Sequence, residues 1–298
     1  MPKFPPSYHV RSLALGLPDV VRLPAAERMP IARSFLRLKF KALGLSLLRS
    51  DRQATSEKIL DWTVTSSDQP EDIDFLFHEM FVQRPYDMLD ASKYGPGHQP
   101  TFFDCGANIG FATGFFKMKF PDARVVAFEP DPQTFANLKA NVTNNGWANV
   151  ELHQVGLGAE DTVGALEDTE RSWNSQVQRV VEAGPDTAPE RTIEVRRLSQ
   201  FIGDSDVDLM KIDIEGAELG VLRELDEAGK LKQVQALAAE YHHYTDKPDS
   251  ASRLTEFLGL LERNGFSVQI DTMERHLSPV GSPQGMLIRA FRPDAQPS

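Results

Sequence analysis

The sequence predicts an α/β fold in the C-terminal two thirds of the chain, with a doubly wound and mostly parallel sheet. Two glycines four residues apart, Gly106 and Gly110, open the first helix of this region. A further apolar strand ends at Asp213 and is followed by another helix. Regular alternation of strands and crossover helices is typical of such a sheet. Strand-like and helix-like segments alternate at 101–104, 109–119, 124–129, 132–145 and 149–155.

The turn after the first strand is a candidate ligand site. Asp104 ends the strand, and Gly106 can adopt a positive φ or let the backbone approach a ligand closely. Gly110 lets the new helix pack closely against the strand. The N-terminus of that helix offers backbone N–H groups that lack helical partners. The turn therefore offers both space and hydrogen-bond donors to a ligand.

The second strand ends in Glu129, 25 positions after Asp104. An acid in this place can accept hydrogen bonds from both hydroxyls of a ribose. The spacing Asp104-x-Gly106-x-x-x-Gly110 lacks the third glycine of dinucleotide-binding turns. An acid at the strand end also suits a ligand with a cationic amine and no phosphate. These residues therefore favour a nucleoside over a dinucleotide.

The next part of the chain offers further contacts. Gly156-Leu157-Gly158 follows the third strand and is either a segment that contacts an adenine ring or a plain turn. Residues 159–196 interrupt the alternation with three short strands, and such insertions often carry substrate specificity. Trp173 and Asn174 are candidate substrate contacts, although a loop tryptophan as often packs. The three short strands are predicted at 162–166, 176–181 and 192–196.

Polar side chains follow two later strands. Asp213 and Glu215 come after the strand at 207–213, and Glu240, His242 and His243 follow the strand at 234–239. Because the carboxyl ends of parallel strands share one edge of a sheet, we expect these groups near the glycine turn. An acid and an imidazole can act together on a substrate hydroxyl. The alternative is that the two histidines are ordinary surface or packed side chains.

These motifs together resemble a known family. Asp104-x-Gly106-x-x-x-Gly110 and Phe128-Glu129-Pro130 look like the first two motifs of class I S-adenosylmethionine-dependent methyltransferases. The run 208–218, DLMKIDIEGAE, is close to the signature D-L-x-K-I-D-x-E-G-x-E of the FkbM-type members. The resemblance covers residues 102–243. It departs at Leu198-Ser199, where the family commonly has Leu-Asp.

The resemblance implies a seven-stranded, Rossmann-like sheet whose last strand is antiparallel, with the strands at 266–270 and 285–291 as a hairpin. It also implies S-adenosylmethionine as the cofactor and O-methylation of a hydroxyl on a sugar, glycoside or secondary metabolite. The residues that would bind the cofactor are Asp104, Gly106, Ala107, Asn108, Gly110, Glu129, Pro130, Gly156, Leu157 and Asp213.

The catalytic candidates are His242, Asp213 and Glu240. His242 or Asp213 is the expected base, since a histidine can be neutral near pH 7. A second hypothesis places a divalent cation such as Mg²⁺ on Asp213 and Glu240, where it would bind the hydroxyls of the acceptor. The residues expected to contact the acceptor are Glu215, His243, Trp173 and Asn174.

Residues 1–100 are expected to form a helical extension or lid before a methyltransferase domain at 101–298. Prolines should break up the first thirty residues, and amphipathic helices follow at 31–48 and 71–83. From Arg28 to Arg52 there are seven basic residues and one acid. This segment is either a packed helix with a solvated basic face, a membrane-surface helix or a clamp for an anionic substrate.

Composition narrows the class of protein. The 298 residues carry a net charge of −11, which argues against nucleic acid as the main partner. The single cysteine, Cys105, allows no internal disulfide and fits a reducing compartment. With neither an 18-residue apolar run nor the pattern of a signal peptide, we expect a cytoplasmic protein that acts on a small molecule. A nicotinamide-dependent oxidoreductase and a non-catalytic nucleoside-binding or membrane-associated protein stay open as alternatives.

Overall fold

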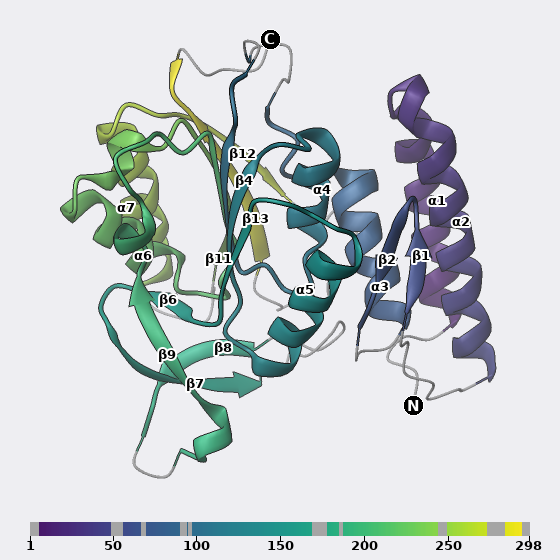
Figure 1. The fold of residues 1–298 in the computed structure, drawn as a ribbon, viewed down its shortest axis with the longest axis horizontal. Coiled ribbons are helices and arrows are strands. Elements are labelled where there is room, and N and C mark those ends of the chain that lie inside the picture. Colours follow the sequence, from purple (N-terminus) through teal and green to yellow (C-terminus); the bar gives the residue numbers. More distant parts are fainter. Residues whose placement is uncertain are drawn as a thin grey trace.

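The centre of the molecule is a seven-stranded sheet (Figure 1). The computed structural model describes residues 6–48, 56–66, 70–89, 94, 97–168, 178–184, 187–243, 249–272 and 284–293. In spatial order the strands are β5 (Val150–His153), β4 (Arg124–Phe128), β3 (Thr101–Cys105), β10 (Leu209–Ile212), β11 (Ala236–His243), β13 (Gln284–Phe291) and β12 (Ser267–Thr272). Neighbours pair in parallel except β13, which is antiparallel to both β11 and β12. The predicted seven-stranded sheet with an antiparallel last strand is confirmed.

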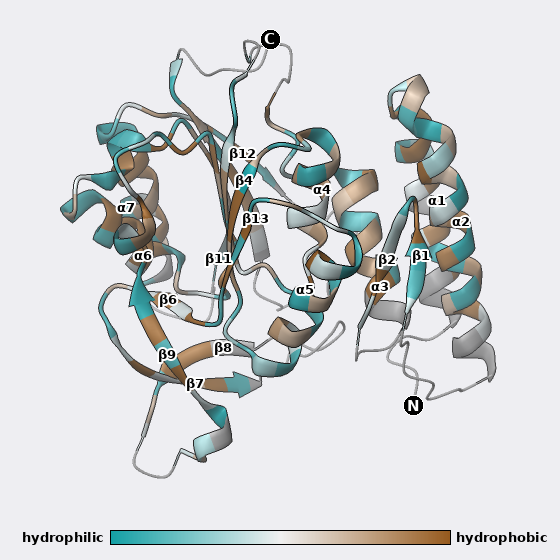
Figure 2. Ribbon diagram, viewed as in Figure 1, coloured by the Kyte–Doolittle hydropathy of each residue, from teal (hydrophilic) through white to brown (hydrophobic). Residues whose placement is uncertain are grey.

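Helices cover both faces of this sheet because neighbouring residues of a strand point to opposite sides. Phe102 of β3 belongs to a hydrophobic cluster with residues of α4 (Phe111–Lys119) and α5 (Pro132–Asn144). Phe103 belongs to a second cluster with residues of α6 (Glu218–Glu227) and α7 (Ser250–Arg263). Figure 1 shows these helix pairs on opposite sides of the sheet, and Figure 2 shows the apolar strands between them.

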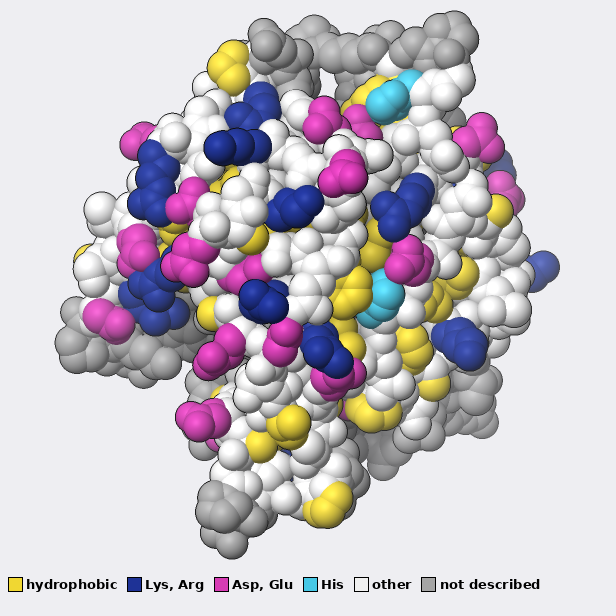
Figure 3. Space-filling view, turned by 60° about the vertical axis from the view of Figure 1, so that its left-hand side comes forward, with side chains coloured by type: hydrophobic (Ala, Val, Ile, Leu, Met, Phe, Trp, Pro, Cys, Tyr) yellow, Lys and Arg dark blue, Asp and Glu magenta, His cyan; other side chains and the backbone are white. Residues whose placement is uncertain are grey.

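The outer surface on the α6–α7 side carries charges of both signs. Figure 3 shows basic and acidic side chains interspersed there. Arg223 of α6 pairs with Glu256 of α7 at 2.5 Å, and Arg263 of α7 pairs with Asp226 of α6. Exposed ion pairs contribute only ~0–1 kcal/mol each. Burial of apolar side chains therefore holds these helices on the sheet.

The inserted segment forms a second, four-stranded sheet. Its strands lie in the order β6 (Gly156–Gly158), β9 (Thr192–Arg197), β7 (Thr162–Asp168) and β8 (Gln178–Glu182). Three of these strands match the prediction for 159–196, but Gly156–Gly158 is a strand and not a turn, because it pairs in parallel with β9. Trp173 and Asn174 lie outside the described residues. Short 3₁₀ helices lie at Pro189–Arg191, Leu198–Phe201 and Lys230–Gln233.

The N-terminal segment is a set of helices with a small β-ribbon. Within the described residues, the prediction that prolines break up the first thirty residues holds only at Pro24, between the first two helices, since Pro18 and Pro30 lie inside them. Proline keeps a helical φ and removes one hydrogen bond, and the burial of side chains such as Val20 and Phe35 offsets that loss. The elements are α1 (Pro6–Arg22), α2 (Ala25–Leu48), β1 (Glu57–Ile59), β2 (Trp62–Val64), α3 (Pro70–Phe77) and a π-helix, η1 (His78–Gln83).

The basic residues between 28 and 52 do not share one solvated face. Lys39 is buried, where it donates to Ser12 at 2.7 Å and pairs with Asp74 of α3 at 2.9 Å. Arg33 and Arg37 are exposed, whereas 49–52 lie outside the described residues. Membrane contact through this segment stays a prediction. None of the described helices combines the length and apolarity needed to cross a bilayer.

The N-terminal segment shares a hydrophobic core with the sheet. The ring of Phe81 in η1 lies 5.1 Å from Trp62 of β2 and 5.8 Å from Phe115 of α4, measured between centroids. Asn141 of α5 and Asn145, directly after it, add polar contacts: Asn141 accepts from the backbone N–H of Thr65 at 2.6 Å and Asn145 from that of Thr63 at 2.8 Å. The segment is thus fixed against α4 and α5.

Candidate active site

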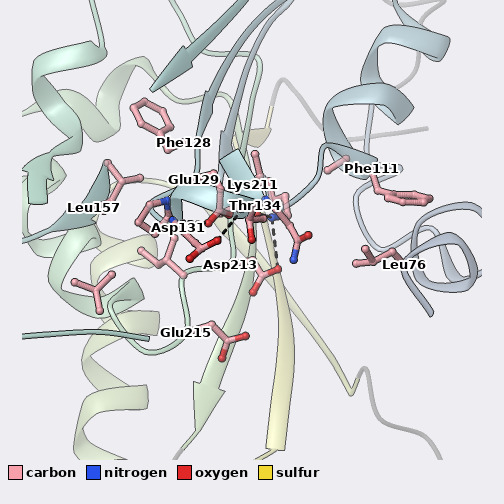
Figure 4. A pocket seen from close by; sticks show the side chains of 18 of the residues that line it. Leu76, Phe111, Phe128, Glu129, Asp131, Thr134, Leu157, Lys211, Asp213 and Glu215 are labelled. Atoms are coloured by element: carbon pink, nitrogen blue, oxygen red, sulfur yellow. Dashed lines mark hydrogen bonds and ion pairs between the residues drawn. The ribbon is translucent and has the colours of Figure 1, made fainter. Parts of the chain in front are cut away.

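A pocket lies beyond the carboxyl ends of β3, β4 and β10 (Figure 4). It contains about 1030 Å³ of space, part of which is open to solvent. Figure 4 shows Leu76 and Phe111 at one end and Leu157 at the other, with Glu129 and Asp213 between them. Open α/β sheets bind their ligands at this edge. The N-terminal segment, the main sheet and the second sheet all contribute to its wall.

The glycine turn at one side of the pocket is held by both neighbouring strands. The backbone N–H groups of Gly106 and Ala107 donate to the carbonyl oxygen of Phe128, at 3.1 and 2.8 Å. Gly106 has a φ of +83°, and a Cβ there would lie 1.8 Å from the carbonyl oxygen of Asp213. Glycine is therefore required at position 106. The backbone after β10 passes so close to this turn that a side chain would not fit, whether or not a ligand is bound.

Asp104 does not line the pocket. Its fully buried side chain accepts a hydrogen bond from Thr113 at 2.7 Å and lies 3.4 Å from the Lys211 Nζ. Lys211 also donates to the carbonyl oxygen of Gly106 at 2.7 Å and lies 3.5 Å from the carboxylate of Asp213. Burial lowers the pKa of Lys211, but the carboxylates around it outweigh burial and raise the pKa above its usual value. The charged lysine therefore links β3, β10 and the turn.

Glu129 lies in the pocket at the end of β4. Its carboxylate accepts hydrogen bonds from the backbone N–H groups of Asn108 and Asp131, both at 2.9 Å. Burial raises the pKa of Glu129 to about 7, although these two hydrogen bonds act to lower it. A carboxylate so placed can still accept hydrogen bonds from a ligand, because its two oxygens offer about four acceptor positions.

Most of the other residues predicted to bind the cofactor also line the pocket. Gly110 does not: its φ is +96°, and a Cβ there would lie 2.8 Å from Leu138. This glycine therefore lets α4 pack against α5, and the prediction that it packs against the strand is wrong. The predicted cofactor residues in the pocket are Gly106, Ala107, Asn108, Glu129, Pro130, Gly156, Leu157 and Asp213.

Acidic and imidazole groups gather beside the pocket, at the ends of β10 and β11. The carboxylate of Glu215, a residue at φ +55°, lies 3.2 Å from Nε2 of His242. Nδ1 of the same ring lies 2.7 Å from the buried carboxylate of Glu218. Glu240, on the same face of β11, lies 3.9 Å from Nε2. The fold thus brings together Glu215, Glu240 and His242, as the sequence predicts, and adds Glu218.

The charge of His242 differs from the prediction. Burial lowers the pKa of this histidine, but Glu215, Glu218 and Glu240 outweigh burial and raise the pKa well above 6.5. An imidazolium with both nitrogens facing carboxylates has no lone pair for a substrate proton. The expectation of a neutral histidine near pH 7 is therefore wrong in this arrangement. Its catalytic role stays a prediction.

His243 faces away from this cluster. Successive residues of a strand point to opposite sides, and the His243 ring lies 6.3 Å from that of Tyr241, between centroids. Tyr241 in turn packs against Phe257 of α7 at 5.0 Å. This placement gives no support to the predicted contact between His243 and the acceptor.

A candidate cation site lies in the same cluster. Asp213, Glu215 and His242 each offer a ligand atom within 4.8 Å of the other two. The bond from Nδ1 to Glu218 orients the ring so that Nε2 faces Glu215, as second-shell carboxylates do for metal-binding histidines. The sequence predicts Asp213 and Glu240 as the cation ligands. The structure instead groups Asp213 with Glu215 and His242.

Five polar residues of the pocket have no predicted role in binding or catalysis: Glu79, Tyr86, Asp131, Thr134 and Lys211. Glu79 and Tyr86 come from the N-terminal segment, and Lys211 lies in β10. The apolar stripe at 71–83 marks only the buried face of its helix, so it assigns no role to Glu79 on the other face. Lys211 lies inside the signature run 208–218, and this position is the sequence feature that indicates a role in the site.

Comparison with known proteins places the chain in a family. Residues 104–268 match the model of the Methyltransferase FkbM domain. Methyltransferase 1 of Beauveria bassiana (strain ARSEF 2860) is 32% identical over 221 residues, which cover 67% of this chain and 83% of that protein. The 31-O-demethyl-FK506 methyltransferase FkbM of Streptomyces tacrolimicus is 29% identical over 223 residues, which cover 65% and 82%.

Among solved structures, the methyltransferase FkbM from Methylobacillus flagellatus KT aligns with a TM-score of 0.44 and 18% identity. The alignment covers 74% of this chain and 53% of that one. The match to the family model spans more than half of the chain and contains the glycine turn, Glu129 and the acidic cluster. The chain belongs to the FkbM methyltransferase family.

Proposed function

We propose that the chain transfers a methyl group from S-adenosylmethionine to a hydroxyl of a sugar, glycoside or other secondary metabolite. The charge of the pocket carries this proposal. S-adenosylmethionine has an ammonium and a sulfonium against one carboxylate, so it suits an anionic pocket, whereas the pyrophosphate of a nicotinamide dinucleotide does not. Among the described lining residues, Lys211 is the one cation against the five carboxylates of Glu79, Glu129, Asp131, Asp213 and Glu215.

The lining residues fit the parts of this cofactor. Glu129 would accept hydrogen bonds from the two ribose hydroxyls. The apolar side chains of Val155, Leu157 and Ile214 would cover the adenine ring. Asp213 would lie toward the amino-acid end, next to the glycine turn. Family membership also argues against the oxidoreductase and non-catalytic alternatives.

When bound, the cofactor supplies an activated methyl group on its sulfonium. The residues of this chain must then align the acceptor oxygen and receive its proton. Alignment can lower a barrier by ~7–11 kcal/mol, and a positioned base accelerates proton transfer about 10²–10⁴-fold. Asp213 and Glu215 line the pocket, and one of their carboxylates would receive the proton. His242 positions Glu215 through the 3.2 Å contact at Nε2.

Oxygen is the acceptor atom that the observations favour. The name of the similar protein from Streptomyces tacrolimicus, 31-O-demethyl-FK506 methyltransferase, specifies an oxygen. Glu215 and Glu240 add carboxylate oxygens that can accept hydrogen bonds from several hydroxyls of one substrate. The name supports transfer to oxygen, and the carboxylates support an acceptor with several hydroxyls.

A divalent cation is a second way for the same cluster to act. Asp213, Glu215 and, once its Nε2 has lost a proton, His242 would hold the ion, which would bind the acceptor hydroxyls and lower their pKa. Titration with Mn²⁺, followed by electron paramagnetic resonance, tests this candidate. Wild-type chain should bind the ion and Glu215→Gln should not. Equal binding by both would exclude this site.

Isothermal titration calorimetry with S-adenosylhomocysteine tests the cofactor. Binding of this nucleoside without binding of NADH would support the proposal, and binding of NADH alone would overturn it. Methyl transfer to a panel of glycosides and macrocyclic alcohols then tests the acceptor, and a methoxy signal in the NMR spectrum of the product identifies O-methylation. His242→Ala should bind the nucleoside normally and lose methyl transfer.

A further inference from the structure

The N-terminal segment contributes two polar side chains to the pocket. Glu79 lies in the π-helix η1, and Tyr86 lies three residues after that helix ends. Both precede residue 104, where the match to the FkbM domain begins. Leu76, from the helix that leads into η1, lines the pocket with them and lies at one end of it in Figure 4. Part of the pocket wall therefore comes from a segment that the family match does not cover.

Tyr86 has a buried hydroxyl without a partner. Its side chain is 2% exposed, and the hydroxyl has no hydrogen bond within the described part of the chain. The backbone around it is fixed, because Arg289 of β13 donates to the carbonyl oxygen of Pro85 at 3.1 Å. Asp87 adds ion pairs to Lys119 and, at 2.6 Å, to Arg84. A buried hydroxyl without a hydrogen-bond partner costs free energy, so the binding of a ligand group that forms this hydrogen bond would be favoured.

Glu79 is directed to the pocket by the packing of its helix. Phe81, two residues on, is fully buried against Trp62 and Phe111, at 5.1 and 6.4 Å between ring centroids. Among the described residues, no hydrogen bond or ion pair reaches the Glu79 carboxylate. Burial, followed by the charge of Asp213, raises the pKa of this carboxyl to about 7. π-helical turns are frequent at functional sites.

Asp213 lines the pocket together with both groups. After burial, its charge is the largest cause of the raised pKa of Glu79 and of Tyr86. Lys211 is a cation beside these groups: its Nζ lies 5.5 Å from the centroid of the Tyr86 ring and 3.5 Å from the Asp213 carboxylate. This lysine is already shared with Asp104 and the carbonyl oxygen of Gly106. A cationic ligand group with several N–H donors therefore fits this part of the pocket.

We propose that Glu79 and Tyr86, together with Asp213, form a subsite for the ammonium group at the amino-acid end of the cofactor. The inference rests on the proposed function and assigns residues to one end of that ligand. An ammonium group donates three hydrogen bonds, which two carboxylates and one phenol oxygen can accept. The ammonium would also supply the missing partner of the Tyr86 hydroxyl. The N-terminal segment is then part of the binding site and not only a cover over it.

Three adenosine probes test the subsite by calorimetry on the full chain. S-adenosylhomocysteine carries an ammonium and a carboxylate, its decarboxylated form carries the ammonium alone, and 5′-methylthioadenosine carries neither. Glu79→Gln and Tyr86→Phe should each lower the affinity for the first two probes about 10- to 100-fold, because a hydrogen bond to a charged group is lost. Neither variant should change the affinity for 5′-methylthioadenosine. Gln83→Ala, at an exposed position of the same π-helix, should change none of the three.

The outcomes separate this proposal from the proposed function. Unchanged affinities, or equal weakening for all three probes, would overturn the ammonium subsite. Weaker binding of S-adenosylhomocysteine alone would mean that the residues bind its carboxylate, and this result would also overturn the ammonium subsite. If wild-type chain binds none of the probes, the proposed function fails instead. Thermal unfolding without probe checks each variant, and Tyr86→Phe, which removes a single oxygen atom, keeps the test available if Glu79→Gln does not fold.

Discussion

A Cβ on Gly106 would lie 1.8 Å from the carbonyl oxygen of Asp213. This contact joins the turn after β3 to the residue that follows β10, and both residues line the pocket. Since a carbonyl oxygen of the backbone cannot rotate away as a side chain can, any larger residue at position 106 must displace one of the two segments. The shape of the pocket therefore depends on this glycine.

Gly106→Ala should be more destabilising than an alanine at another glycine with the same φ. Gly97 is the matched control, because its φ is +85° against +83° for Gly106 and nothing lies within 4 Å of a Cβ there. We expect Gly106→Ala to lower the free energy of unfolding by about 1–3 kcal/mol more than Gly97→Ala, measured in urea. Only Gly106→Ala should lose binding of S-adenosylhomocysteine. Equal costs would mean that φ alone makes glycine necessary.

Lys211→Met should destabilise the chain strongly. The variant leaves the buried carboxylate of Asp104 without its cation and the carbonyl oxygen of Gly106 without its donor. Removing one partner of a buried ion pair costs ~3–5 kcal/mol in the free energy of unfolding. Lys232→Met, at an exposed lysine, is the control and should change stability by less than about 0.5 kcal/mol. A small effect at Lys211 would show that the pair is not needed to join β3 and β10.

His78 should make stability depend on pH. Burial and, after it, the charge of Lys39 lower the pKa of His78 to about 3, while an unfolded histidine titrates near ~6.5. Below that value the unfolded chain binds a proton that the folded chain does not, so stability is complete above pH ~6.5 and falls as the pH is lowered. Between pH 7.5 and 5 we expect a loss of about 2 kcal/mol from this group. The loss in wild type should exceed that in His78→Phe by this amount, and equal losses would assign the titration to other groups.

Glu129→Gln should lower the affinity for every ligand that contains a ribose. Because the proposed contacts are to the ribose hydroxyls, S-adenosylhomocysteine and 5′-methylthioadenosine should lose affinity equally, by about 10- to 100-fold. Glu151→Gln, at an exposed glutamate of the neighbouring strand, is the control and should bind both normally. This pattern differs from that expected of Glu79→Gln, which should spare 5′-methylthioadenosine. If Glu129→Gln weakened the binding of only one of the two ligands, Glu129 would not be the residue that binds the ribose.

The sequence by itself determined the fold class and the edge of the sheet that carries the site. Alternating strands and helices allow few arrangements other than a doubly wound sheet, and the carboxyl ends of its parallel strands must meet at one edge. Glu129, Asp213 and Glu215 could be assigned to that edge for this reason, and the structure has them lining one pocket. Local patterns of apolar residues and glycines were sufficient here because the sheet follows from them.

The tertiary structure alone decided which groups are charged, buried or in contact. Gly106 and Asp213 are 107 positions apart, and no local pattern encodes how closely their backbones approach. The carboxylates that surround His242 set its charge, and they come together only when β10, β11 and α6 pack. Glu79 reaches the pocket because Phe81 anchors η1 against α4. Burial and distance fix pKa values and pocket walls, and both quantities arise only when distant segments pack together.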